Sequence, residues 1–392
     1  MSAAHPEVVV VAASRTPQGR IGGALASLSA VDLGAAAIRG ALAQGGVSAS
    51  AVDAVLAGNV LQAGSGQNPA RQAAIAAGIG WSAPAATVNA VCLSGTAAII
   101  DAARRIRLGE AEVVVAAGME SMSRAPHLLP GSRAGWRYGD AVAVDHAAHD
   151  GLTDAFGHES MGALVERDNA ALGITREEQD AIALRSHRLA ARAAEDGVFD
   201  AEITPVDAPR HGTVTGDEGI RPDASAKRLA GLRPAFATGG SITAGNASQL
   251  SDGAAAVVLT TRDRAESEGW TVLAALGAHA QIAGPDTALH DRPARAVEAA
   301  CVREGITPGD LDLLEINEAF AAVVARSQAL LGVDPDDVNV HGGGIALGHP
   351  IGASGVRLVV HLAHELARRG GGIGAAALCG GGGQGDAVLL RR

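Results

Sequence analysis

Two segments of this 392-residue chain repeat the same order of elements, and this repetition constrains the fold more than any other feature. In the first segment, "VCLSG" around Cys92 is followed by an apolar helical stretch and the strand-like run "EVVVAAG". In the second, "GHPIGASG" around His349 is followed by a helix over 356–369 and the run "GAAALCGG". We expect an internal duplication whose two turns face one cleft, although any chain of alternating strands and helices shows similar echoes.

The rest of the chain alternates strand-like and helix-like segments in the rhythm of an α/β fold. Runs such as "VVVVAAS" and "AVLAGNV" are separated by helical stretches up to residue 118, and the alternation returns after residue 250. The intervening residues are rich in turn formers, with a few helices. We therefore expect an inserted loop domain at 119–250, between an N-terminal domain (1–118 plus 251–270) and a C-terminal domain (271–392).

Charge and composition exclude several functional classes. The formal net charge is -11 and the 31 Lys and Arg residues are scattered, whereas a nucleic-acid surface needs them clustered. The N-terminal segment has no basic region, and its apolar run from Val8 to Ala13 is too short for a signal or membrane segment. Three distant cysteines without a C-x-x-C pair fit a reducing compartment and disfavour a zinc site. We expect a cytoplasmic protein that binds no nucleic acid, membrane or metal.

Cys92 stands where a strand-like run ending at Val91 meets the helical stretch that follows Ser94 and Gly95. Backbone N–H groups at a helix start favour a thiolate and can bind an oxyanion, and small neighbours let a thioester approach. We therefore expect a Cys92 thiol of lowered pKa that acts as a nucleophile. The alternative is an inert cysteine that packs as a small hydrophobe.

The second half of the chain offers three further candidates. His349 lies between a glycine and a proline that aim its imidazole, so it can take a thiol proton or donate to an oxygen, although many histidines are only satisfied core residues. Cys379 ends a strand before "GGGGQG", which is otherwise explained as a hairpin turn. Asn317 follows the strand "LLEI", where a helix cap also explains it. Cys301 lies on the apolar face of a helix and receives no function.

Five motifs occur in a fixed order along the chain: "VCLSG", "ITAGNASQLSDGAA", "NEAFA", "GGGIALGHPIGASG" and "CGGGGQG". Together they resemble the thiolase family and, within it, the acetyl-CoA acetyltransferases. The resemblance runs from "RTPQGR" near the start to the C-terminal glycine loop, so it covers nearly the whole chain. One such motif is weak, whereas five in order are highly specific.

The resemblance implies an α/β thiolase fold of two duplicated βαβαβαββ domains in a layered α/β/α/β/α arrangement, with a loop domain inserted in the first. It implies an acyl-CoA C-acyltransferase of lipid and fatty-acid metabolism that condenses two acetyl-CoA to acetoacetyl-CoA, or cleaves 3-ketoacyl-CoA by thiolysis. Coenzyme A and acetyl-CoA are then substrates, with no permanently bound cofactor. The loop domain would bind coenzyme A, and the chain would form a homotetramer or homodimer.

The resemblance also assigns chemical roles. Cys92 would carry the acyl group as a thioester, His349 would activate it, and Cys379 would be the acid/base that removes the α-proton of the second acyl-CoA. Asn317 would hold a water that stabilises the enolate oxygen together with His349, and the backbone N–H groups of Cys92 and Gly381 would form a second oxyanion site. Two thiols are needed because one cysteine cannot store the acyl group and act as base at once.

Four other residues match positions that contact coenzyme A or the acyl group: Arg221, Ser248, Met161 and Phe320. Some positions depart from the family's common pattern: Leu93, Thr96, Ser160 and Gly344. These departures touch no reacting group but could reshape the pocket, so the preferred acyl chain length stays open. Two other functions also stay open, a ketoacyl synthase-like condensing enzyme and a non-catalytic protein that binds acyl-CoA or lipid.

Overall fold

The computed structural model describes residues 6–392, and within them one sheet of ten strands organises the molecule. The strand order is β12-β13-β14-β11-β1-β10-β5-β3-β4, with the short β2 paired to β10. The bounds of these strands are β1 Val8–Arg15, β2 Gly19–Arg20, β3 Ala54–Gly58, β4 Ala85–Val88, β5 Val113–Ser121, β10 Ser251–Thr261, β11 Ala274–Ala283, β12 Leu313–Ile316, β13 Ile373–Gly380 and β14 Gln384–Arg391.

The two halves of the sheet repeat one topology, which confirms the expected duplication. In the N-terminal half, β1, β10 and β5 are antiparallel neighbours, and β3 is parallel to β5. In the C-terminal half, β11, β14 and β13 are antiparallel neighbours, and β12 is parallel to β13. The halves meet where Val9 and Val10 of β1 pair with Ala275 and Ala274 of β11.

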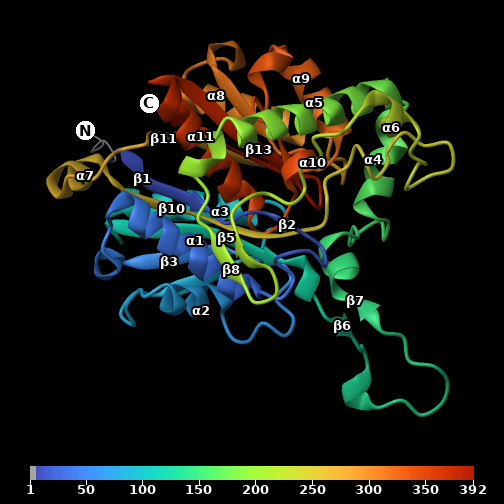
Figure 1. The fold of residues 1–392 in the computed structure, drawn as a ribbon, viewed down its shortest axis with the longest axis horizontal. Helices are drawn as coiled ribbons and strands as arrows, with labels where there is room; N and C mark the ends of the chain where they lie inside the picture. The colour runs from blue at the N-terminus through green and yellow to red at the C-terminus, as the bar shows by residue number, and fades with distance from the viewer. Residues whose placement is uncertain (1–5) are drawn as a thin grey trace.

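Helices cover the outer face of each half-sheet and fill a shared middle layer (Figure 1). α1 and α2 pack on the N-terminal half, α8 and α9 pack on the C-terminal half, and α3 and α11 lie together between the halves. This gives the expected five layers. The helix bounds are α1 Ala30–Gly45, α2 Pro69–Ala76, α3 Ser94–Arg107, α7 Arg262–Glu268, α8 Arg292–Glu304, α9 Ala321–Leu331, α10 Gly344–Leu347 and α11 Ser354–Arg369.

The starts of α3 and α11 approach so closely that glycine is required at their contact. A Cβ on Gly95 would lie 2.8 Å from the backbone nitrogen of Val356, and one on Gly355 would lie 2.5 Å from that of Thr96. Glycine leaves room for this approach because it has no side chain. The turns that precede the two helices, one in each half of the chain, are thereby brought to the same place.

An insertion, residues 122–250, connects β5 to β10, whereas the matching connection from β13 to β14 is a turn of three glycines at 381–383. The β6–β7 arm of the insertion projects away from the body (Figure 1). Among the described residues, no helix is long and apolar enough to cross a bilayer. The elements of the insertion are α4 Met161–Asn169, α5 Arg176–Glu195, α6 Ala226–Ala230, and the hairpins β6 His127–Leu128 with β7 Val144–Asp145 and β8 Val206–Ala208 with β9 Gly212–Val214.

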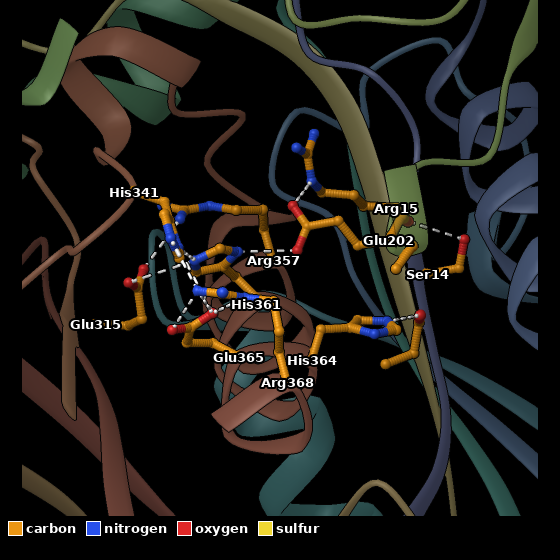
Figure 2. A network of polar contacts seen from close by, with 12 residues as sticks. Ser14, Arg15, Glu202, Glu315, His341, Arg357, His361, His364, Glu365 and Arg368 are labelled. Carbon is orange, nitrogen blue, oxygen red and sulfur yellow. Dashed lines mark hydrogen bonds and ion pairs between the residues drawn. The ribbon is translucent and has the colours of Figure 1, made fainter. Parts of the chain in front are cut away.

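A buried cluster of charges joins the insertion to both halves of the chain (Figure 2). The Glu202 carboxylate accepts hydrogen bonds from Nε of Arg15 on β1 at 2.7 Å and from Nδ1 of His361 on α11 at 2.9 Å. Asp217 accepts from the other side of the Arg15 guanidinium at 2.7 Å. These side chains are almost completely buried, so loss of one partner leaves an uncompensated charge.

Candidate active site

Cys92 lies in the short connection between β4 and α3, as the sequence predicts. The preceding Val91 has a φ of 53°, in the left-handed region that a β-branched residue rarely enters. Such a conformation costs about 1–3 kcal/mol and persists only where its surroundings hold it. The Ser94 hydroxyl closes this turn, because it donates to the Val91 carbonyl at 2.6 Å and accepts from the Ala90 N–H at 2.9 Å.

Cys92 lines a small cavity of about 50 Å³ that lies between the two halves of the chain and the insertion. Three reactive side chains line this cavity, those of Cys92, His349 and Cys379. The other lining residues are mostly apolar or small: Gly151, Leu152, Met161, Ser248, Leu289, Ala319, Phe320, Ile351, Gly380 and Gly381. A second cavity of about 290 Å³ shares much of this lining and is also mainly apolar.

The structure brings most of the sequence-predicted site residues to the small cavity: Cys92, His349, Cys379, Gly381, Met161, Ser248 and Phe320. Asn317 lies against His349, with its Nδ2 3.4 Å from each ring nitrogen. The Asn317 Oδ1 is buried and has no hydrogen-bond partner among the described residues. Arg221 lines neither cavity. Its side chain is exposed, and its backbone N–H donates to Nδ1 of His187 at 3.2 Å.

Burial dominates the electrostatics of the Cys92 thiol. Its pKa is raised to about 12, chiefly because burial disfavours the thiolate and also because Glu120 is nearby. Hydrogen bonds to the sulfur from the backbone N–H groups of Cys92 and Gly381 oppose this rise without cancelling it. The expectation of a lowered pKa is therefore wrong. The turn does supply N–H donors, but desolvation outweighs them.

His349 is neutral at physiological pH. Burial, aided by the positive charge of Arg357, lowers the pKa of its imidazole to about 3. Its Nδ1 lies 2.6 Å from Oγ of Ser354, and that hydroxyl donates to the Pro350 carbonyl at 3.0 Å. Because a hydroxyl has only one proton, Nδ1 carries the ring proton and donates it to Ser354. Nε2 is then an unprotonated base.

Cys379 is the second-last residue of β13 and reaches the cavity from the opposite half of the chain to Cys92. Burial raises the pKa of its thiol well above the usual range, and the proximity of Cys92 raises it further. The cavity therefore holds two protonated thiols and one neutral imidazole. A proton leaves either thiol only as another group at the site accepts it.

Neither Ser354 nor Glu120 is predicted from the sequence as a site residue. Glu120 accepts hydrogen bonds on both sides of the site, including one from the turn that carries His349. One signal was available in the sequence. An acidic residue inside the apolar run "VVVAAGMES" must be buried with partners if that run is a core strand.

Two thiols and a neutral imidazole beside an apolar cavity are typical of enzymes that transfer acyl groups through sulfur. Comparison with known protein families agrees with this class. Residues 8–263 match the family model described as "Thiolase, N-terminal domain", and residues 270–392 match "Thiolase, C-terminal domain". The chain belongs to the thiolase family, and it is an acyltransferase.

Relatives are similar over nearly their whole length. A probable acetyl-CoA acetyltransferase of Mycolicibacterium smegmatis is 56% identical over 388 residues, covering 98% of this chain and 100% of the relative. An acetyl-CoA acetyltransferase of Chromobacterium violaceum is 49% identical over 390 residues, covering 98% and 100%. The crystal structure of human mitochondrial 3-ketoacyl-CoA thiolase in complex with CoA matches with a TM-score of 0.94 at 38% identity, over 98% of each chain. The thiolase fold is confirmed.

Proposed function

We propose that the chain catalyses the reversible Claisen condensation of two acetyl-CoA molecules to acetoacetyl-CoA and coenzyme A, and the thiolysis of 3-ketoacyl-CoA in reverse. The observation that carries the proposal is the presence of Cys92, His349 and Cys379 on one cavity of about 50 Å³. The names of the relatives support acetyl-CoA as the substrate. The CoA complex of the human thiolase supports coenzyme A as the acyl carrier.

In the first half-reaction, the Cys92 sulfur attacks the acetyl-CoA carbonyl while its proton passes to Nε2 of His349. The bond to coenzyme A breaks, and Cys379 gives its proton to the leaving thiolate. The products are acetylated Cys92, free coenzyme A, an imidazolium and a Cys379 thiolate. The N–H groups of Cys92 and Gly381 stabilise the oxyanion of the tetrahedral intermediate, a role that their hydrogen bonds to the Cys92 sulfur support.

In the second half-reaction, the Cys379 thiolate removes the α-proton of another acetyl-CoA, and the enolate attacks the acetyl group on Cys92. As the carbon–carbon bond forms, Cys92 leaves as a thiolate and recovers its proton from the His349 imidazolium. The enolate oxygen is stabilised by Nε2–H of His349 and by a water held by Asn317. The unpartnered Oδ1 of Asn317 supports this role. All three reacting groups return to their starting states.

Acetylation of the protein tests the proposal. Incubation with acetyl-CoA should add one acetyl group, found by mass spectrometry on the peptide that contains Cys92. An acetyl group on Cys379 or Cys301, with Cys92 free, contradicts the assignment. Thiolysis rates over 3-ketoacyl-CoA substrates of increasing length then measure the acyl preference, and the small cavity favours the shortest. Use of an acylated carrier protein in place of acetyl-CoA would favour a ketoacyl synthase.

We further propose that the insertion, with its exposed Arg221, binds coenzyme A, and that it mediates assembly. Met161 and Ser248 of the insertion line both cavities. Four large apolar side chains are exposed on the β6–β7 arm: Leu129, Trp136, Tyr138 and Val142. Exposed apolar side chains that gather in one place mark interaction sites, and β4 ends the sheet with an open edge. We propose a homotetramer or homodimer located in the cytoplasm, and light scattering of the purified protein with and without the arm tests the assembly.

A further inference from the structure

We propose that Glu120 is a positioning residue of this active site, whose carboxylate holds the turn that carries His349 against the wall of the cavity beside Cys92. The inference deepens the proposed function and rests on it. Glu120 is the second-last residue of β5, and its side chain is completely buried. It lines neither cavity, so it acts through the residues that it holds.

Four N–H donors converge on the Glu120 carboxylate. Oε1 accepts from the Asn59 side chain at 2.8 Å and from the Leu61 backbone at 3.1 Å. Oε2 accepts from the backbone of Val60 at 3.0 Å and from that of Gly352 at 3.0 Å. Three donors therefore come from the segment that follows β3, and the fourth comes from the other half of the chain. The carboxylate bridges the two halves at the site.

Each of the two segments that Glu120 joins lies next to a reacting group. The segment after β3 joins Ile351 in an apolar cluster against which Cys92 packs. Gly352 follows His349 by three residues, so its position sets that of the imidazole. The turn packs closely against β3, because a Cβ on Gly58 would lie 2.6 Å from the Gly352 carbonyl oxygen. This contact and the hydrogen bond to Glu120 together fix the position of Gly352. Release of the Gly352 N–H should therefore change how His349 meets the Cys92 thiol.

Glu120 also acts on the thiol through its charge. Burial raises the pKa of its carboxyl to about 7, against the opposing effect of the backbone donors and with a further rise from Asp252. The Glu120 charge in turn raises the pKa of the Cys92 thiol. We call the four hydrogen bonds to the Glu120 carboxylate the clamp. Loss of the charge and loss of the clamp have separable effects, since only loss of the charge lowers the pKa of the Cys92 thiol.

The variant Glu120→Gln removes both contributions at nearly constant shape. The amide nitrogen cannot accept a hydrogen bond, so at least one of the four N–H groups loses its acceptor. We expect the rate of Cys92 acetylation to fall about 10-fold or more, because the reacting groups are misplaced, with the KM for acetyl-CoA little changed. We also expect the alkylation of Cys92 by iodoacetamide, followed against pH, to titrate at lower pH than in the wild type.

Asp53→Asn is the matched control, because Asp53 braces backbone N–H groups at the opposite end of β5. Its Oδ2 accepts from Glu112 at 2.8 Å and from Val113 at 2.9 Å. This variant should lower Tm without changing the acetylation rate or the alkylation profile. If Glu120→Gln does only the same, Glu120 is merely structural and the proposal is overturned.

Glu120→Asp keeps the charge but shortens the reach of the carboxylate by one methylene. Slow acetylation with an unshifted alkylation profile is expected, and a wild-type acetylation rate would overturn the clamp even if Glu120→Gln fails to fold. Iodoacetamide alkylation needs no acyl transfer. A wild-type protein that is alkylated but never acetylated would therefore overturn the proposed function, while the shift expected for Glu120→Gln stays measurable.

Discussion

A thiol that is protonated at neutral pH is a weak nucleophile unless its proton is removed as it reacts. With the pKa of Cys92 raised to about 12 and that of His349 lowered to about 3, a thiolate–imidazolium pair is disfavoured before substrate binds. Acyl transfer changes this balance, because the developing thiolate becomes a neutral thioester. At the scale of single residues, reactivity therefore depends on where each proton lies, and not on a preformed thiolate.

Cys379→Ser should separate the two half-reactions. In the variant, the leaving coenzyme A thiolate can take its proton from the His349 imidazolium instead of from Cys379, so acetylation of Cys92 should survive largely intact. Condensation needs the α-proton removed, and a hydroxyl is far less acidic than a thiol, so acetoacetyl-CoA formation should fall by at least ~100-fold. Both rates are measured on one preparation. Near-normal condensation by the variant would refute the role proposed for Cys379.

Ser354→Ala should slow the acetylation of Cys92 by about 5-fold, the factor expected from one lost hydrogen bond of about 1 kcal/mol. The hydroxyl is the acceptor that keeps the proton on Nδ1 of His349 and leaves Nε2 free. Single-turnover acetylation measures the effect. Ser327→Ala is the control, because Ser327 is equally buried and its hydroxyl has no hydrogen-bond partner among residues 6–392. Equal rates in the two variants would contradict the role of Ser354.

At the scale of elements, the site exists because two turns precede two helices that touch. The sequence predicts both turns, and the structure confirms a strand-to-helix connection at Cys92. It also confirms the helix after His349, which begins at Ser354 and not at the predicted residue 356. The role of the glycines, however, depends on the neighbouring helix. In the sequence, Gly355 is only one glycine of a glycine-rich turn. In the structure, it packs directly against the backbone at Thr96.

Gly355→Ala should destabilise the protein by about 1–3 kcal/mol through overpacking. The added Cβ would lie 2.5 Å from the backbone nitrogen of Thr96, so α3 and α11 must separate. Acetylation of Cys92 should slow in parallel, because the two turns move apart with the helices. Gly216→Ala is the control, since a Cβ at Gly216 meets nothing within 4 Å. Denaturant unfolding and single-turnover acetylation of both variants check this, and unchanged values for Gly355→Ala would contradict it.

At the scale of the whole molecule, the charge cluster around Glu202 holds the insertion over the two halves (Figure 2). Burial by itself would raise the pKa of Glu202, but Arg15 and His361 hold it well below its usual range. The pKa of His361 is raised, because Glu202 and Glu315 outweigh the effect of its burial. The insertion also supplies lining residues of both cavities, so this cluster anchors a segment that forms part of the site.

Glu202→Gln should lower the free energy of unfolding by about 3–5 kcal/mol, because it leaves the buried His361 without its nearest carboxylate and Arg15 with Asp217 alone. The effect should depend on pH with a definite sign. The contribution of Glu202 is present above its unfolded pKa of about 4.3 and is lost as pH falls further, while that of His361 is present below about 6.5 and is lost as pH rises through its folded pKa. The difference in Tm between wild type and variant should therefore be largest between these values. A pH-independent difference would contradict this assignment.

The sequence by itself determined the α/β class, the duplication, the strand-to-helix turn at Cys92 and, through ordered motifs, the thiolase family. The first three follow from local pattern, because hydrophobic periodicity and turn residues act over a few neighbours, whereas the family rests on the resemblance of the five motifs. The tertiary structure alone decided the protonation states of Cys92 and His349, the tautomer set by Ser354, the bridging position of Glu120 and the exposure of Arg221. Each of these depends on burial or on a partner far away in the chain, such as Gly352 for Glu120, and desolvation has no signature in local sequence.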